Sequence, residues 1–383
     1  MIYLDNAATT WPKPPCVREA VRQALEVYGA NPGRGGHAMG MAASQEIYRC
    51  RETAARFFHL DNPAHVVFTL NCTMALNIVL KGLLHDGGHI VVSSLEHNAV
   101  MRPLEALSTD EKVYSVAAVV PGNPEETVRN FRRCVTPRTK AVLCTHASNV
   151  FGCRLPIRRI GEMAHRLGLL FIVDAAQSAG VLPIDMKADH IDYLCVPGHK
   201  GLYGPMGTGM LLCGPDTPLS TWMEGGTGSQ SLLLTQPEEL PDRLESGTVN
   251  TPGICGLRAG MEWVTKAGVD RIGRHETRLM AMLHDRISGI PGLRLYTPRP
   301  RLEETVPVLS VNIDGLSSEE TGAHLDRMGI AVRPGLHCAP SAHRQWGTVP
   351  DGTVRLAPSA FTTEAQIEKT AHILREIARK PLQ

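Results

Sequence analysis

Short apolar runs alternate with amphipathic stretches of helical length through the first 215 residues. The runs that we predict to be strands are 66–70, 89–94, 141–148, 169–176 and 191–198. Between them, segments such as 73–84, 124–135 and 156–168 carry apolar residues at helical spacing. This βα repetition predicts an α/β fold in which helices cover both faces of a mostly parallel sheet, with ligands bound beyond the carboxyl ends of the strands.

The pattern changes after residue 252, where two long helical segments lead into shorter elements. The elements that we expect there are helices at 252–268, 271–290, about 317–329 and near 363–378, and strands at 293–297, 306–313, 330–335 and 353–359. This is typical of a smaller α/β domain. We therefore expect an N-terminal arm (1–15) on the side of the small domain, a large domain (16–252) and a small C-terminal domain (253–383).

Composition and charge narrow the classes of function. Hydrophobic residues make up 43% of the 383-residue chain and charged residues 20%, which is the balance of a globular protein. Lys plus Arg number 39 against 38 Asp plus Glu, so no basic surplus draws the protein to nucleic acid or an anionic membrane. No apolar run approaches the ~20 residues that span a bilayer, and the N-terminus lacks a signal-peptide pattern. We expect a cytoplasmic protein with a small-molecule or protein partner.

Ten cysteines are scattered along the chain without a C-x-x-C pair. A cytoplasmic chain of this length needs no disulfides, so we expect nine of the ten to be inert thiols. The exception is Cys338, which follows an apolar strand in a Gly- and Pro-containing loop beside His337. A cysteine in such a loop beside a histidine can lose its proton and become a nucleophile.

Lys200 and Asp174 each follow a predicted buried strand. Lys200 lies among Gly198, Gly201 and Gly204, where the backbone can approach a ligand closely. A desolvated lysine has a lowered pKa and can attack an aldehyde to form a Schiff base. An aspartate at a neighbouring strand end can keep a pyridine nitrogen protonated. The alternatives are a solvated surface lysine and an aspartate that caps a helix.

Five motifs follow one another along the chain. They are LDNAATT (4–10), SLEHNAVMRPL (94–104), VDAAQ (173–177), GHK (198–200) and ESGTVNTPG (245–253). Together they resemble the class V aminotransferase superfamily of pyridoxal phosphate (PLP) enzymes. The resemblance implies the PLP-dependent transferase fold, in which a large domain has a seven-stranded, mostly parallel sheet and a smaller α/β domain follows.

The same resemblance implies which residues bind PLP. Lys200 would hold its aldehyde carbon as a Schiff base, and Asp174 would pair with the ring nitrogen. Gln177 would hydrogen-bond the phenolic oxygen of the ring, and His97 would stack on the ring face.

Phosphate contacts are implied as well. Thr73 opens a helix, whose free N–H groups and dipole favour a dianion, and His199 would add a contact. Thr248 would come from the other subunit of a homodimer. The chain departs from the family at two places: Pro197 replaces a frequent serine, and Asn71–Cys72 replace Gly-Thr, which puts Cys72 beside the cofactor.

The pattern R-x-G-x-H-C-A at 333–339, followed by G-T-x-R at 352–355, resembles the cysteine desulfurase and selenocysteine lyase branch. There a cysteine in a short catalytic loop takes the sulfur, which implies that role for Cys338 in the small domain. By the same matching, Asn149 and Arg355 would bind the substrate carboxylate. Arg333 and His37 would line the pocket, and His37 would reach it across the dimer.

We therefore expect a PLP-dependent cysteine desulfurase that converts L-cysteine to L-alanine and leaves a persulfide on Cys338. Lys200 or His97 would move the α-proton. The sulfur acceptor would be a small thiol or a sulfur-acceptor protein.

Other readings stay open. One is a selenocysteine lyase, because L-selenocysteine would share every contact except the chalcogen. Another is a class V aminotransferase or C–S lyase in which Cys338 is structural. A metal site of His337, Cys338 and His343 lacks compact four-ligand spacing, so we expect no metal. A redox sensor built on Cys338 would leave Lys200 and Asp174 unexplained.

Overall fold

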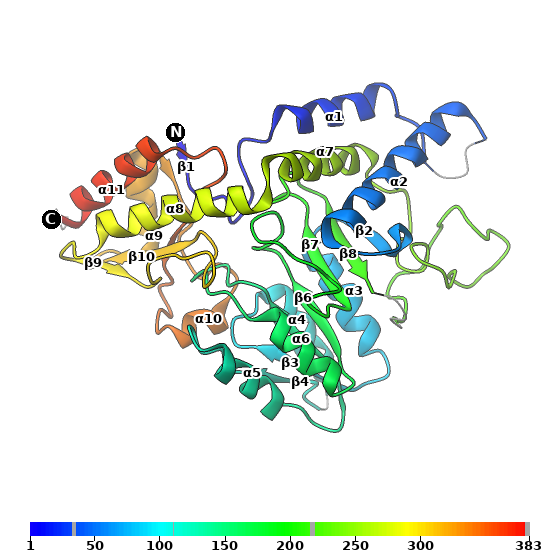
Figure 1. The fold of residues 1–383 in the computed structure, drawn as a ribbon, viewed down its shortest axis with the longest axis horizontal. Helices are drawn as coiled ribbons and strands as arrows, with labels where there is room; N and C mark the ends of the chain where they lie inside the picture. The colour runs from blue at the N-terminus through cyan, green and yellow to red at the C-terminus, as the bar shows by residue number, and fades with distance from the viewer. Residues whose placement is uncertain (33–35, 110, 215–218, 380–383) are drawn as a thin grey trace.

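The computed structural model describes residues 1–32, 36–109, 111–214 and 219–379. In this part the largest sheet has seven strands, in the order β2-β8-β7-β6-β5-β3-β4 (Figure 1). They are β2 (Val66–Thr69), β3 (His89–Ser93), β4 (Tyr114–Ala117), β5 (Thr139–Thr145), β6 (Leu170–Asp174), β7 (Tyr193–Pro197) and β8 (Gly209–Cys213). Five of them run parallel in the pairs from β7 to β4, and β8 is antiparallel to both of its neighbours. The predicted mostly parallel α/β fold is confirmed.

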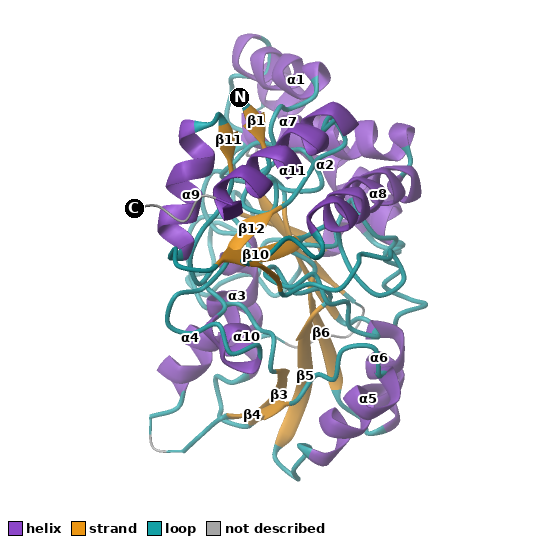
Figure 2. Ribbon diagram, turned by 90° about the vertical axis from the view of Figure 1, so that its left-hand side faces the viewer, coloured by secondary structure: helices purple, strands orange, loops and turns teal. Residues whose placement is uncertain are grey.

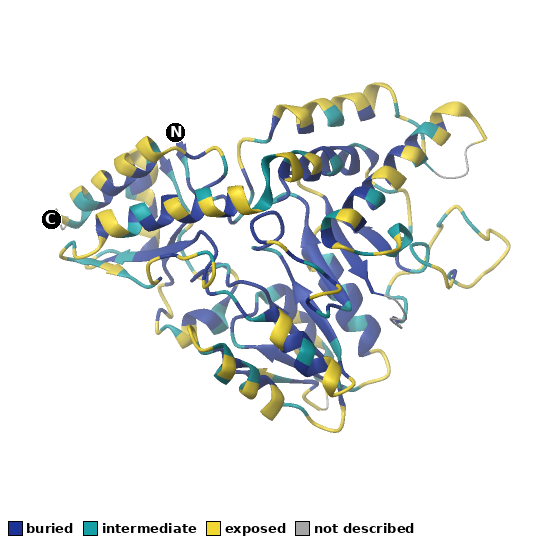
Figure 3. Ribbon diagram, in the orientation of Figure 1, coloured by how far each residue is buried: buried dark blue, intermediate teal, exposed yellow. Residues whose placement is uncertain are grey.

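Burial explains why the strands were readable. Every residue of β2, β3, β7 and β8 is buried, and Figure 3 shows the central strands as the dark blue interior of the molecule. A strand covered on both faces must be apolar along its whole length. The pattern missed β8 and also the edge strand β4, in which Val116 is exposed and the apolar run is broken.

Helices cover the sheet on both faces, as predicted. Figure 2 shows α3 and α4 on one side of strands β3 to β6, and α5 and α6 on the other. The helices around this sheet are α1 (Pro15–Glu26), α2 (Ala38–Phe58), α3 (Cys72–Leu83), α4 (Asn98–Leu107), α5 (Pro124–Arg133), α6 (Ile157–Arg166) and α7 (Thr251–Ala267), with a 3-10 turn η1 (Pro63–His65). Within the described residues, no helix is long and apolar enough to cross a bilayer.

A second, smaller layer is formed by β1 and by the elements that follow α7. A three-stranded antiparallel sheet has the order β12-β10-β9, and β1 pairs in parallel with β11. The elements are β1 (Ile2–Tyr3), α8 (Val269–Ile287), β9 (Leu293–Leu295), β10 (Leu309–Ile313), α9 (Ser318–Arg327), β11 (Ile330–Ala331), α10 (Pro340–Gln345), β12 (Val354–Leu356) and α11 (Glu364–Arg379). The start of the chain therefore lies against this smaller layer.

Core packing places α7 with the large sheet. Its side chains Ile254, Leu257 and Met261 join the cluster that contains the large-sheet strands, whereas Leu279 and Met280 of α8 join the core of the smaller layer. The division of the chain at residue 252 stays a prediction.

A buried ion pair connects α2, β2 and the segment before α7. The guanidinium of Arg51 lies 2.5 Å from the carboxylate of Glu245, and both side chains are at most 10% exposed. Arg51 also donates to the carbonyl of Val66 and lies over the ring of Phe68, whose N–H donates to Glu245 at 2.6 Å. Because each charge has hydrogen-bond partners, the desolvation cost of the pair is offset.

Neutralising one partner of this pair should destabilise the fold. We expect Glu245→Gln to lower the free energy of unfolding by about 3 kcal/mol, because Arg51 is left as an uncompensated buried charge. Urea unfolding of the apoprotein measures it. The matched control is Glu26→Gln, which breaks an exposed pair with Arg22 and should cost less than about 1 kcal/mol. Equal losses in the two variants would contradict the argument.

Candidate active site

The site lies where parallel strands β6 and β7 end side by side. Asp174 is the last residue of β6 and pairs in register with Cys195 of β7. Strand β7 ends at Pro197, and Lys200 follows three residues later. The chain therefore brings Asp174 and Lys200 to one edge of the sheet, where the predicted pair was expected.

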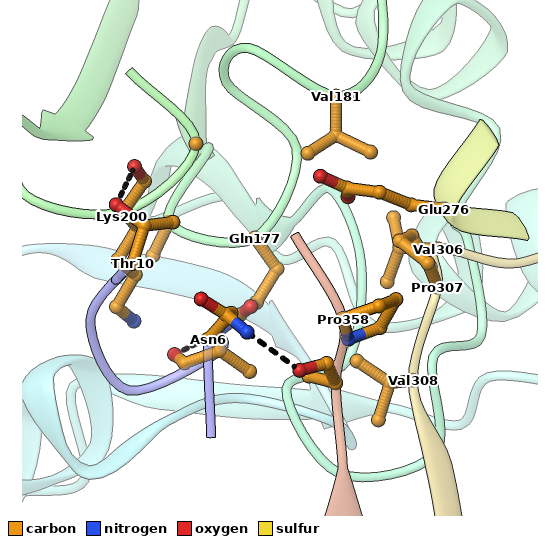
Figure 4. Close-up of a pocket in the computed structure, with 14 residues that line it drawn as sticks. Asn6, Thr10, Gln177, Val181, Lys200, Glu276, Val306, Pro307, Val308 and Pro358 are labelled. Carbon is orange, nitrogen blue, oxygen red and sulfur yellow. Dashed lines mark hydrogen bonds between the residues drawn. The ribbon is translucent and has the colours of Figure 1, made fainter. Parts of the chain in front are cut away.

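The N-terminal segment holds the backbone that carries Lys200. The hydroxyl of Thr10 donates to the carbonyl of Lys200 at 3.0 Å, and Lys13 donates to the carbonyl of His199 at 2.7 Å. Figure 4 shows Thr10, Lys200 and Gln177 around one small cavity of about 30 Å³. The position of the amine thus depends on residues nearly two hundred places earlier in the chain.

Burial sets the protonation of Lys200. Removal from water lowers the pKa of its amine from 10.5, and the nearby carboxylate of Asp174 opposes that shift without cancelling it. A neutral amine is a nucleophile, so the environment suits attack on an aldehyde carbon.

Asp174 is held by two donors on the same oxygen. Its Oδ1 accepts from the N–H of Ala176 at 2.8 Å and from the thiol of Cys72 at 3.4 Å. Burial and the carboxylate itself raise the pKa of Cys72 well above its ordinary value, so the thiol keeps its proton and stays a donor. Cys72 is thus in contact with Asp174, as its predicted place beside the cofactor requires.

His97 sits at the start of α4 with a defined tautomer. Its Nδ1 accepts from the N–H of Ala99 at 3.0 Å, which leaves the proton on Nε2 in the neutral ring. Burial lowers the pKa of His97, with Asp174 opposing this and Lys200 adding to it. The ring therefore shares one electrostatic environment with Lys200 and Asp174.

A place for an anionic group lies beside these residues. Helix α3 begins at Cys72, so the N–H groups of Cys72 and Thr73 precede its first intrahelical hydrogen bond. His199 has a buried Nδ1 that finds no partner within the described part of the chain. Burial, with the charges of Lys200 and Lys13, lowers the pKa of His199 to about 4. A neutral ring with a free nitrogen and open helix amides together suit a phosphate group.

The loop with Cys338 docks against α4. The carbonyl of Cys338 accepts from the N–H of Asn98 at 2.7 Å, and the carbonyl of His337 accepts from the side chain of Asn149 at 2.8 Å. Cys338 itself is exposed. The structure therefore brings this cysteine next to His97, which precedes Asn98 in the chain.

Arg355 is buried beneath this loop. It donates to Asp5 and to the carbonyl of Asn149, each at 3.0 Å, and burial lowers its pKa while Asp5 opposes the shift. Its Nε is buried and has no partner in the described residues. That free donor is what a substrate carboxylate would take, and Asn149, which gives one of its two amide N–H groups to the loop, retains the other.

Two predicted site residues lie elsewhere in the chain. Thr248 lines a separate cavity of about 250 Å³ beside β2 and the start of α3. His37 is exposed and caps α2 through the N–H of Gly40, and in Figure 1 that end of α2 lies at the edge of the molecule. Arg333 pairs by its backbone with Arg355, but its side chain is exposed. The structure does not bring Thr248 or His37 to this site within the described part of the chain.

His337 does not fit its expected role beside the nucleophile. Its ring is buried, it contacts Arg333 and His343 through its two nitrogens, and burial lowers its pKa to about 3. It therefore has no free nitrogen with which to take a proton from Cys338. Sequence reasoning also missed Asp5 and Asn98, although both lie in motifs that carry the resemblance.

A family model described as aminotransferase class-V matches residues 2–370. The chain belongs to this family. A relative named a probable cysteine desulfurase, from Methanothermobacter thermautotrophicus, is 34% identical and covers 98% of this chain and 94% of its own. The solved apo structure of a cysteine desulfurase from Thermococcus onnurineus NA1 has a TM-score of 0.89 at 30% identity, over 99% of this chain and 94% of that one. A cysteine desulfurase from Escherichia coli has a TM-score of 0.86 at 25% identity, over 100% and 95%.

The residues present fit the cofactor that class V aminotransferases imply. A desolvated amine on Lys200, a carboxylate on Asp174 and a free buried nitrogen on His199 correspond to the aldehyde, ring nitrogen and phosphate of PLP. Gln177 gives one amide N–H to the carbonyl of Ala7 at 3.0 Å and retains a second for the ring oxygen.

The lowered pKa of Lys200 can be measured directly. We expect the rate of imine formation between apoprotein and pyridoxal to rise with pH to a plateau, with an apparent pKa below 10.5. In Asp174→Asn that pKa should fall further, because the carboxylate that opposes the shift is gone. Stopped-flow absorbance follows the reaction, and Lys200→Ala is the blank. An apparent pKa at or above 10.5, or a higher one in the Asp174 variant, would rule out this account of the amine.

Proposed function

We propose that this protein is a PLP-dependent cysteine desulfurase that transfers sulfur from L-cysteine to Cys338. The observation that carries the proposal is the hydrogen bond from the N–H of Asn98 to the carbonyl of Cys338, which anchors the backbone of an exposed cysteine at the start of α4, next to His97. The names of the relatives support this reading over a selenocysteine lyase or another C–S lyase.

When bound, PLP supplies an aldehyde that captures the substrate amine and a ring that withdraws electrons from its α-carbon. The buried amine of Lys200, with its lowered pKa, would hold the aldehyde and would take the α-proton of the substrate. Arg355 binds the substrate carboxylate through its free Nε, which orients the substrate sulfur. Asp174 would pair with the ring nitrogen and favour its protonated form, and Cys72 holds the Oδ1 of Asp174 in place.

The sulfur transfer step balances without an added redox partner. The thiolate of Cys338 attacks the substrate sulfur, an S–S bond forms and the C–S bond breaks. The electron pair stays with the substrate carbon, which is then protonated. L-cysteine and the Cys338 thiol thus give L-alanine and a Cys338 persulfide, and a small thiol or an acceptor protein removes the outer sulfur.

A homodimer completes the site in this proposal. Thr248 and His37 do not reach Lys200 within one chain, so a partner subunit would bring them to the phosphate and the substrate. Apolar surface supports the same conclusion: Leu232 and Leu234 are fully exposed on the segment that projects from the body in Figure 1. Exposed consecutive leucines are costly unless another surface covers them.

Removing the nucleophile tests the reaction. We expect Cys338→Ala to lower alanine formation from L-cysteine by a factor on the order of 10³ or more, with the cofactor absorbance unchanged. The control is Cys16→Ala, since Cys16 is the other exposed cysteine in the described chain. Parallel assays with L-selenocysteine show whether the rate of alanine formation depends on sulfur or selenium in the substrate. Undiminished alanine production in Cys338→Ala would refute the proposal.

Removing the cross-subunit hydroxyl tests the dimer. We expect light scattering to give twice the chain mass, and Thr248→Ala to weaken PLP binding about 10-fold through loss of a hydrogen bond to a charged group. Thr221→Ala removes an exposed hydroxyl that contacts Glu224 and should leave affinity unchanged. An active monomer would be the contrary result.

A further inference from the structure

The loop at 332–339 holds two adjacent residues in a backbone conformation that they rarely adopt. His337 has φ of 50° and Cys338 has φ of 55°, and neither is glycine. Such conformations persist only where the surroundings over-determine them. The Cys338 loop must therefore be held by contacts stronger than its own preferences.

Side chains behind the loop provide these contacts. Nε2 of His337 lies 2.9 Å from the carbonyl of Arg333, and Nδ1 of His337 lies 3.3 Å from Nε2 of His343. Nδ1 of His343 lies 2.7 Å from the hydroxyl of Thr348. His343 is fully buried, and His337 and Thr348 are nearly so.

The chemistry of the groups fixes which one donates in each of these hydrogen bonds. A carbonyl can only accept, so His337 carries its proton on Nε2 and accepts on Nδ1. His343 must then donate from Nε2 and accept on Nδ1, where the Thr348 hydroxyl donates. Burial lowers the pKa of His337 to about 3 and of His343 to about 4, so both rings are neutral, as this arrangement requires.

These hydrogen bonds act on Cys338 through the backbone of the loop. The ring of His337 is fixed by His343 on one side and Arg333 on the other. Its own carbonyl is held by Asn149 and the next carbonyl, that of Cys338, by the N–H of Asn98.

We propose that His343 is a positioning residue for Cys338, fixing through the ring of His337 the loop conformation that docks the cysteine against the start of α4. This deepens the proposed function, since it concerns the same nucleophile, but the loop geometry can be tested apart from turnover. The occupied nitrogens also argue against the two histidines as ligands of a metal.

Two substitutions at His343 separate hydrogen bonding from packing. Phe in His343→Phe keeps an aromatic ring against Phe151, which lies edge-to-face with His343 at 5.5 Å, but it removes the donor. Gln in His343→Gln loses the ring and keeps an N–H for His337. We expect kcat for alanine formation to fall about 10- to 100-fold in His343→Phe, with KM for L-cysteine and the cofactor spectrum unchanged. In His343→Gln, kcat should be at least half of the wild-type value. A role in packing alone predicts the reverse order.

Hydrogen exchange at Asn98 provides the readout that does not need turnover. Asn98 opens α4, so its N–H has no intrahelical acceptor, and its protection reports the carbonyl of Cys338. We expect this amide to exchange at least ~10-fold faster in holoenzyme carrying His343→Phe, and at the wild-type rate in His343→Gln. Thr348→Val, which leaves both rings in place, should give a smaller increase and serves if His343→Phe does not fold.

The outcomes distinguish the two proposals. If wild-type protein forms no alanine from L-cysteine, the proposed function fails, and exchange at Asn98 still decides whether His343 positions the loop. Unchanged exchange at Asn98 in His343→Phe and Thr348→Val, or a more active Phe than Gln variant, would overturn the inference.

Discussion

The site depends on one amine being kept out of water beside one carboxylate. Burial disfavours the charged form of Lys200, and Asp174 only partly restores it. An unpaired lysine at this depth would be costly, and the parallel strands β6 and β7 are what make the position available. Their apolar residues pack on both faces, so the free energy that buries Lys200 comes from the sheet rather than from the site.

The smaller layer contributes Arg355 and the Cys338 loop, which carry the substrate contacts of the proposed reaction. Arg355, Asn149 and the Cys338 loop meet through hydrogen bonds that cross between the two layers. Ser310 of β10 also donates to the carbonyl of Val150 at 2.6 Å, close to this junction. Each of these bonds joins a side chain of one layer to a backbone carbonyl of the other, so the packing of the two layers fixes the position of the loop.

Much of the fold was readable from the sequence, because buried parallel strands leave unbroken apolar runs and because polar residues at their ends stand out. That logic singled out Lys200 and Asp174, which the structure brings together, and the motif around Cys338 pointed to the residue that we propose as the nucleophile. It could not find the ion pair between Arg355 and Asp5, which lie 350 residues apart. Nor could it show that the ring of His337 contacts His343 rather than the thiol. The two histidines are six residues apart, and their contact depends on how α10 packs. Such contacts are tertiary, and the spacing of apolar residues along the sequence does not predict them.

The cysteines differ in their surroundings, which decide whether a thiol is buried and keeps its proton. Burial raises the pKa of Cys213 to about 12 and of Cys153 to about 11, so those thiols stay protonated and unreactive. Cys72 shows a third use of the same side chain, since its proton is retained in order to donate to Asp174. Cys338 is exposed, as Cys16 is, and it differs in that the carbonyls of His337 and Cys338 are both held by hydrogen bonds. If Cys338 is the nucleophile, as proposed, the backbone that holds it sets its position, which gives a reason for so short a loop to be anchored at so many points.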